Sequence, residues 1–279
     1  MQDKFLMLPN NLVWNYWDKN DTYLKTYGDK IIHIFSYLEC CTNKFDKVVF
    51  NIKDLITLSG MTPKSGKGKT NEQFKDILES LRLKGIIESN TNFNKLEISE
   101  YINCSFNMPI SCDKDGSAYH FFTINVEDYL NIVDRYLGKL NKLILLKVYF
   151  YINARISKRN TAGSRQIVIT GGKANCFYDS IDNIISDLKI AKETWDKYTK
   201  ELKKLGLIDF DNIGKVIKDR KITTATNVYV VDSMELQEGL HQSCIYYRDK
   251  GYKIESKWSY VRKSKKDHKQ IKIKECNPF

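Results

Sequence analysis

Apolar residues in the second half of the chain recur at the spacing of helices, and they predict three of them. Residues 143–154 and 180–188 show apolar positions three to four residues apart. The segment 192–205 predicts a third helix with a single buried stripe, formed by Trp195, Tyr198, Leu202 and Leu205. A break of only a few residues separates the second helix from the third, so we expect a tight turn between them.

The residues after the third helix predict a hairpin. Gly206 is a suitable helix end because glycine adopts left-handed backbone conformations. The segments 207–210 and 226–231 then read as two paired strands. The loop between them, 213–225, carries four basic side chains: Lys215, Lys218, Arg220 and Lys221.

The same pattern occurs earlier in the chain, as an internal repeat. Residues 73–88 align with 194–209 at a constant offset, so that Phe74 matches Trp195 and Gly85 matches Gly206. Three further pairs of segments recur in the same order: 5–8 with 121–124, 31–38 with 143–150, and 54–61 with 183–190. The first copy carries extra residues in or around 63–70, a stretch rich in lysine and glycine.

Helix, short helix, tight turn, helix, glycine and hairpin is the order of elements in a winged helix-turn-helix. In the first copy we expect the third helix at about 71–84 and the hairpin from 86 to about 102. The predicted fold class is therefore α+β, mainly α, with tandem winged helix-turn-helix domains. The predicted domains are residues 1–110 and 117–233, followed by a basic extension at 234–279.

The charge of the chain indicates an anionic partner. The chain has 279 residues, of which 42% are hydrophobic and 28% charged, and a formal net charge of +11. Eleven basic and three acidic residues lie in 248–274, so this tail carries most of the excess. Tyr252, Trp258 and Tyr260 are interspersed there, and lysines with aromatic rings suit contact with nucleic acid.

Other features narrow the class of protein. The longest apolar stretch is far shorter than a membrane-spanning helix needs, and the first residues lack the pattern of a signal peptide. The seven cysteines are odd in number and form no CxxC pair, so we expect reduced thiols in a cytoplasmic protein.

In a winged helix, the third helix enters the DNA major groove and basic side chains around it contact the phosphates. The candidate contacts in the second copy are Lys192, Thr194, Lys197 and Lys200, with the four basic residues of the loop. In the first copy they are Thr70, Asn71, Gln73 and Lys75, preceded by Lys64, Lys67 and Lys69. In the tail they are Arg262, Lys263, Lys265 and Lys266.

We expect no enzymatic activity, cofactor or metal. The segment 63–70 resembles a phosphate-binding loop, but Pro63 stands where the pattern needs glycine and a short helix is predicted before it. The four histidines are scattered, and His33 is expected to be packed within a helix rather than to bind metal. No nucleophile motif is present.

The second copy resembles the winged-helix domain of the replication initiator protein A family, found on plasmids, phages and integrative elements of low-GC Gram-positive bacteria. The resemblance covers roughly residues 118–232. It rests on YHFFTI at 119–124, LILLKVY at 143–149, LKIAKETW at 188–195, LKKLGLI at 202–208 and TNVYVV at 226–231. It implies binding to repeated sites at a replication origin, distortion of AT-rich DNA and recruitment of host helicase-loading proteins.

These observations lead to one main hypothesis and two alternatives. The main hypothesis is a sequence-specific replication initiator that binds double-stranded DNA and recruits helicase-loading or primosomal proteins. The first alternative is a winged-helix transcriptional regulator or a conjugation accessory protein. The second is a primosome or replisome-organising adaptor that acts mainly through protein contacts. Whether the chain forms a homodimer is left open.

Overall fold

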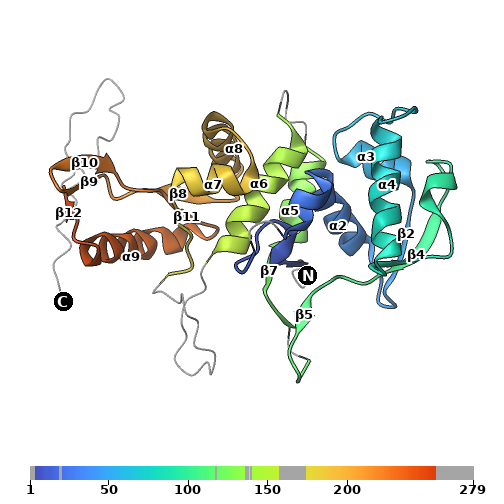
Figure 1. Ribbon diagram of the computed structural model, residues 1–279, viewed down its shortest axis with the longest axis horizontal. Coiled ribbons are helices and arrows are strands. Elements are labelled where there is room, and N and C mark those ends of the chain that lie inside the picture. The colour runs from blue at the N-terminus through green and yellow to red at the C-terminus, as the bar shows by residue number, and fades with distance from the viewer. Residues whose placement is uncertain are drawn as a thin grey trace. The chain divides into compact units, whose positions relative to one another are not determined.

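The computed structural model of the protein describes residues 4–18, 21–116, 118–135, 138, 140–156 and 174–255. The chain combines α helices with small antiparallel sheets (Figure 1), which confirms the predicted mixture of α and β structure. It divides into two compact units. Unit 1 consists of residues 1–154, 187–189 and 193–199, and unit 2 of residues 155–186, 190–192 and 200–279.

The first sequence repeat folds within unit 1 as a group of helices with a three-stranded sheet. In chain order its elements are α1 (Tyr23–Tyr27), α2 (Lys30–Cys41), β2 (Lys47–Phe50), α3 (Ile52–Leu58), α4 (Thr70–Leu83), β3 (Ile87–Glu88), the short 3-10 helix η2 (Phe93–Lys95) and β4 (Ile102–Phe106). The sheet is antiparallel with strand order β2-β4-β3. The helices bury most of their large apolar side chains, and Phe35, Leu55, Phe74 and Leu78 are 0% exposed.

A two-stranded ribbon in unit 1 joins the starts of the two sequence repeats. Strand β1 (Phe5–Pro9) pairs antiparallel with β7 (Phe121–Asn125), so that Leu6 lies opposite Ile124. The internal repeat aligns residues 5–8 with 121–124, and in the structure these two segments pair with each other. After β1 comes the 3-10 helix η1 (Asn10–Leu12), and after β7 comes helix α5 (Val126–Val133). A small hairpin, β5 (Ser111–Cys112) with β6 (Ala118–Tyr119), precedes β7.

After β7 and α5, the second repeat continues with α6 (Lys142–Arg155), which is buried on nearly all sides. Its remaining elements are α7 (Ile181–Leu188), α8 (Lys192–Lys204), β8 (Asp209–Asp211), β9 (Lys215–Lys218), β10 (Lys221–Thr224) and β11 (Val228–Val230). In unit 2, β11 pairs with β8, and Tyr229 of β11 also forms a bridge with Phe177. The strands β9 and β10 form a hairpin beyond this pair.

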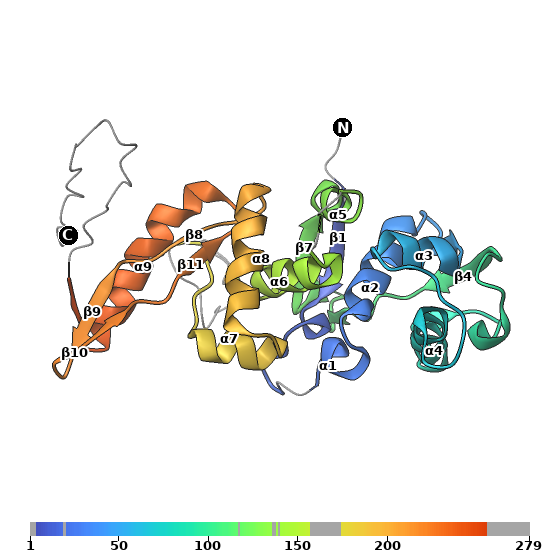
Figure 2. The same ribbon diagram turned by 90° about the horizontal axis from the view of Figure 1, so that it is seen from above.

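Helix α9 (Leu236–Asp249) and strand β12 (Lys253–Ile254) complete unit 2. Strand β12 pairs with the free edge of β9, which gives a three-stranded sheet in the order β10-β9-β12. Figure 2 shows α9 running beside β8 and β11. Apolar side chains hold α9 against the strands: Val216, Cys244 and Tyr247 belong to one cluster, and Val228 and Leu240 to another.

The two glycines matched by the repeat end their helices in the same way. Gly85 and Gly206 have φ angles of 73° and 74°, which glycine adopts without steric cost. After α8, the Gly206 and Leu207 amides donate to the carbonyls of Lys203 and Leu202 at 3.1 and 3.0 Å. After α4, the amides of Gly85 and Ile86 donate to the carbonyls of Arg82 and Leu81, both at 3.0 Å. Both ends are Schellman motifs, and the left-handed conformation that the sequence predicts for Gly206 is present.

Two parts of the chain differ from the expectations. The loop predicted at 213–225 is mostly the hairpin β9–β10, and the predicted extension at 234–279 begins with α9 and β12, which pack into unit 2. The compact units also differ from the predicted domains 1–110 and 117–233, because β1 of the first segment pairs with β7 of the second.

Candidate nucleic-acid interface

Helix α8 separates its apolar from its charged residues. Trp195, Tyr198 and Leu202 are at most 5% exposed, as predicted, whereas Leu205, the fourth residue of the predicted stripe, is half-buried. The opposite face carries five exposed lysines against one exposed acid within this helix, Glu193. The five lysines are Lys192, Lys197, Lys200, Lys203 and Lys204. Helix α8 therefore presents exposed lysines on one face, while its buried apolar face holds the helix in place.

The lysines of α8 differ in how much they are engaged within the protein. Lys203 pairs with Asp209 at 2.5 Å and Lys204 with Glu201 at 3.3 Å. Lys192, Lys197 and Lys200, the three predicted from the sequence, form no ion pair with any residue that the structure describes. The predicted Thr194 is only partly exposed. The unpaired lysines are thus the ones available to an anionic partner.

The hairpin β9–β10 carries the other cations predicted for the second repeat. Lys215, Lys218, Arg220 and Lys221 are all exposed. Asp219 and Arg220 form the turn, with φ angles of 51° and 63°. A non-glycine residue in this left-handed region costs about 1–2 kcal/mol. Three more exposed cations of unit 2 lie in the basic segment 248–274 predicted from the sequence: Arg248 of α9, Lys250 just after it and Lys253 of β12.

The first repeat differs from the prediction at the start of α4. Thr70 and Asn71 were expected to be exposed, but only 9% and 8% of their surfaces are accessible, so neither presents an exposed side chain for reading bases. The preceding loop folds back on the helix: the Asn71 backbone amide donates to the Lys64 carbonyl, and its side-chain amide donates to the Ser65 hydroxyl, both at 3.2 Å. The loop thereby covers the positions that helical periodicity alone placed at the surface.

The remaining predicted residues of α4 form a mixed surface. Gln73 is exposed and its side chain donates to the Gly68 carbonyl at 2.8 Å, whereas Lys75 is half-buried and donates to the Leu96 carbonyl at 2.5 Å. The other exposed residues of the helix are Asp76 and Leu83. The helix is therefore much less cationic on its exposed face than α8.

The loop before α4 keeps its three predicted lysines, Lys64, Lys67 and Lys69, at the surface. Helix α3, rather than a strand, precedes this loop, as the sequence predicts. The backbone amide of Gly68 donates to the Glu72 carboxylate, which occupies a donor that a phosphate-binding loop would offer to its ligand. Three exposed lysines make this loop a secondary candidate for phosphate contact.

The segment between β3 and β4, within the hairpin predicted from residue 86 to about 102, lies against α4. The buried Glu79 carboxylate accepts from the Phe93 amide at 3.0 Å and pairs with Arg82 at 2.6 Å, which lowers the pKa of Glu79. Phe93 is 0% exposed. The exposed charges of the segment are Lys95, Glu97 and Glu100, so the segment is not basic.

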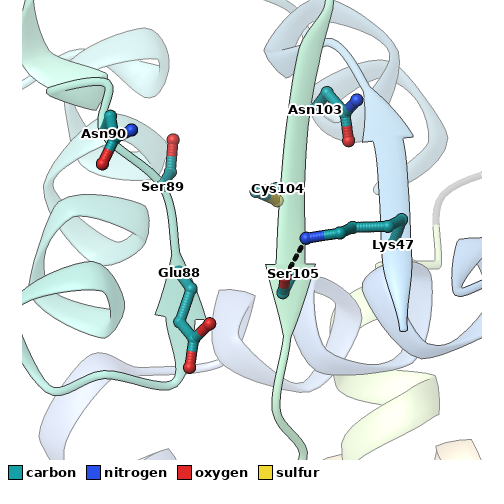
Figure 3. A pocket seen from close by; sticks show the side chains of 7 residues that line it. All are labelled: Lys47, Glu88, Ser89, Asn90, Asn103, Cys104 and Ser105. Carbon is teal, nitrogen blue, oxygen red and sulfur yellow. Dashed lines mark hydrogen bonds between the residues drawn. The ribbon is translucent and has the colours of Figure 1, made fainter. Parts of the chain in front are cut away.

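A surface pocket of about 350 Å³ lies over the outer face of the sheet in the first repeat. Figure 3 shows Lys47 of β2 reaching over β4, where its ammonium group donates to the Ser105 hydroxyl at 2.7 Å. Glu88, Ser89 and Asn90 form the other side. Neighbouring Cys104 is buried, which raises the pKa of its thiol to about 11 and disfavours nucleophilic chemistry. The pocket offers a mixed polar surface and no cluster of cations.

His33 is buried, as expected. Its Nε2 lies 2.9 Å from the Leu55 carbonyl and its Nδ1 lies 3.1 Å from the Tyr129 hydroxyl. Within the described residues, no group of three His, Cys, Asp or Glu side chains could hold a metal ion. None of the helices in the described part has the length and apolar character needed to cross a membrane. The predicted tail contacts Arg262, Lys263, Lys265 and Lys266 lie outside the described residues.

Comparisons with known proteins identify no relative: no model of a protein family, no curated protein and no solved structure matches the chain. The resemblance to the replication initiator family therefore stays a prediction from the sequence.

Proposed function

We propose that the protein binds double-stranded DNA through α8 and the hairpin β9–β10. The observation that carries the proposal is the exposed lysine face of α8, whose members Lys192, Lys197 and Lys200 have no acidic partner among the described residues. A helix face with several unpaired cations suits contact with the negatively charged phosphates of DNA.

The order and pairing of elements support a winged-helix architecture for both repeats. The first runs α2, β2, α3, α4, β3, β4, with a sheet in the order β2-β4-β3. The second runs α6, Phe177, α7, α8, β8, β11, and β11 lies between Phe177 and β8 through its two pairings. In this proposal α8 is the recognition helix and β9–β10 the wing.

We further propose that the bound DNA is a replication origin of a plasmid, phage or integrative element, and that the protein recruits host helicase-loading or primosomal proteins there. This step rests on the resemblance of residues 118–232 to the initiator family. A transcriptional regulator or conjugation accessory protein would bind DNA through the same elements. A replication assay separates these roles: only an initiator maintains a plasmid that carries its binding sites and lacks another origin.

The central test is a triple substitution of Lys192, Lys197 and Lys200 to alanine. Sequences are first selected from random duplex DNA by the wild-type chain at moderate salt, and affinity is then measured by fluorescence anisotropy between 50 and 300 mM salt. We expect the triple variant to lose specific binding, and the slope of log K against log salt to fall by about 3. A variant with the same charge change on exposed lysines elsewhere, Lys44, Lys53 and Lys114 to alanine, is the control. Footprinting on the selected DNA is a second measurement. Equal footprints for the triple variant and the wild type would exclude α8 as the helix that recognises the DNA sequence.

The first repeat favours a second candidate function, that of an adaptor acting through protein contacts. Large apolar side chains are highly exposed there: Phe45 at 83%, Leu83 at 73% and Tyr101 at 76%. Exposed apolar side chains of this size are typical of protein-binding surfaces when they gather. An adaptor would bind DNA weakly and without sequence preference, so the selection experiment distinguishes the two functions.

A further inference from the structure

Strand β4 of the first repeat continues beyond the end of its neighbour β3. Strand β4 has five residues and β3 has two, and Glu88, the last residue of β3, pairs with Ser105. The same register would place Asn103 opposite Asn90, but Asn90 lies outside the strand and the two residues are not paired. Figure 3 shows the chain at Asn90 diverging from β4. This side of β4 therefore has an open edge at Asn103.

The backbone amide and carbonyl of Asn103 point to this open edge. In an antiparallel sheet, the backbone groups of successive residues point to alternate sides of the strand. On the β2 side, the Phe106 amide donates to the Asp46 carbonyl at 3.3 Å. On the β3 side, the Asn107 amide donates to the Ile86 carbonyl at 2.8 Å. Asn103 is four residues from Asn107, so its amide and carbonyl face the β3 side, where they form no hydrogen bond with any residue that the structure describes.

The open edge borders the surface pocket of about 350 Å³, whose lining includes Asn103 and one cation, Lys47. The Lys47 ammonium group has three N–H donors, and its contact with the Ser105 hydroxyl uses one of them. Lys47 forms no ion pair with any of the described residues. Glu88 on the other side accepts from the Asn107 side-chain amide at 2.8 Å. The pocket thus combines an unpaired backbone edge with a cation that has donors to spare.

We propose that an extended segment of a partner protein adds as a strand to β4 at Asn103 and places an acidic side chain on Lys47. An open strand edge is a template for another chain. In such complexes, main-chain hydrogen bonds provide affinity and side-chain contacts provide specificity. Val49 lies opposite Asn103 on β2 and is 57% exposed, which gives the segment an apolar contact on the same face of the sheet. The inference concerns the first repeat and does not depend on DNA binding by α8.

The first test is a selection of random seven-residue peptides, displayed on phage, by the full chain. The same selection is made with Lys47→Gln and with Lys53→Gln, which removes an exposed lysine of α3 and is the matched control. We expect the wild type and the control to enrich the same peptides with an acidic residue. Lys47→Gln should bind these peptides about tenfold more weakly, which is the effect of one charge-assisted hydrogen bond. No enrichment, or unchanged affinity in Lys47→Gln, would overturn the inference.

The second test examines the backbone pairing by NMR of the ¹⁵N-labelled full chain with the most enriched peptide. We expect the amide signal of Asn103 to shift and its hydrogen exchange to slow when the peptide binds. Two further versions of the peptide carry N-methyl groups on the odd or on the even residues. At least one version should lose binding, because alternate amides of an added strand face β4.

Three outcomes of the NMR test would overturn strand addition: an unchanged Asn103 signal, binding that survives both patterns of methylation, or the same shifts with sodium acetate alone. The last of these would indicate a site for small anions only. Neither test uses DNA, so a chain that binds no DNA but passes both tests would overturn the proposed function and leave this inference intact.

Discussion

The Tyr129 hydroxyl lies 3.1 Å from Nδ1 of His33, and this contact joins α5 to α2 inside unit 1. The other ring nitrogen, Nε2, faces the Leu55 carbonyl at 2.9 Å. A neutral imidazole satisfies both neighbours, because Nε2–H donates to the carbonyl and Nδ1 accepts from the phenol. Burial disfavours the charged ring and lowers the pKa of His33 to about 4.

This contact predicts a loss of stability in acid. The unfolded chain binds a proton at His33 below its ordinary pKa of about 6.5, whereas the folded chain does so only near 4. Stability from the neutral ring is therefore complete above about pH 6.5 and falls as the pH drops towards 4, by about 3 kcal/mol in total. Urea unfolding at pH 7 and pH 4 measures the difference for the wild type and for His33→Gln. The variant should lose about 3 kcal/mol less than the wild type over this interval, and equal losses would contradict the assignment.

A second prediction concerns the buried ammonium group of Lys147. It pairs with Asp29 at 2.8 Å and lies 3.4 Å from the Leu188 carbonyl, and the side chains are 5% and 35% exposed for Lys147 and Asp29. Asp29→Asn leaves a buried charge without its partner and should cost about 3 kcal/mol in the free energy of unfolding. Lys147→Met leaves only the half-exposed carboxylate and should cost about 1 kcal/mol. Chemical denaturation of the two variants tests this asymmetry, which equal costs would refute.

A third prediction concerns the close packing of α9 on β11. A Cβ atom at Gly239 would lie 2.9 Å from Cγ1 of Val228 and 3.2 Å from Cβ of Cys176. Although alanine is the better helix former, Gly239→Ala should destabilise unit 2 by about 1–3 kcal/mol through overpacking. Gln237→Ala, at an exposed position of the same helix, is the control and should be neutral. Amide hydrogen exchange in α9 reports the effect, and unchanged protection in Gly239→Ala would argue against tight contact.

A fourth prediction concerns thiol reactivity. Cys112 is exposed, whereas Cys104 and Cys176 are buried with pKa values raised to about 11 by loss of solvent. At pH 7.5 about one in three thousand of such thiols is ionised, so their reaction with a disulfide reagent should be slow. In a Cys276→Ser background, we expect one fast thiol, which Cys112→Ser removes. Burial also raises the pKa of the half-buried Cys40 and Cys41, so a fast phase that survives Cys112→Ser would show that one of these two or a buried thiol reacts readily.

The sequence predicted the helices and their ends well, because those features depend on local chemistry. The stripe of Trp195, Tyr198 and Leu202 repeats at helical spacing, and glycines at 85 and 206 end their helices in Schellman motifs. The three lysines of α8 that the sequence predicts as contacts are exposed, since they lie opposite the buried stripe.

Features that depend on distant segments were not predictable in the same way. Asn71 is buried because the preceding loop folds back over it and Ser65 of that loop accepts from its side-chain amide; helical spacing alone does not predict this contact. The sequence predicts a loop where the hairpin β9–β10 lies, because its turn, Asp219-Arg220, lacks the glycine that marks such turns. The sequence analysis predicts a basic extension at 234–279 and no packed helix there; α9 at Leu236–Asp249 depends on apolar contacts with distant residues, Val216 and Val228 among them.

The antiparallel pairing of β1 with β7 has a consequence for synthesis on the ribosome. Leu6 and its partner Ile124 are separated by more than one hundred residues, and translation at about 5–20 residues per second would need roughly 6–25 s to supply the missing strand. During that interval the nascent first repeat leaves an apolar strand unpaired. We therefore expect chaperone occupancy to begin when β1 emerges and to end only after β7 has left the exit tunnel.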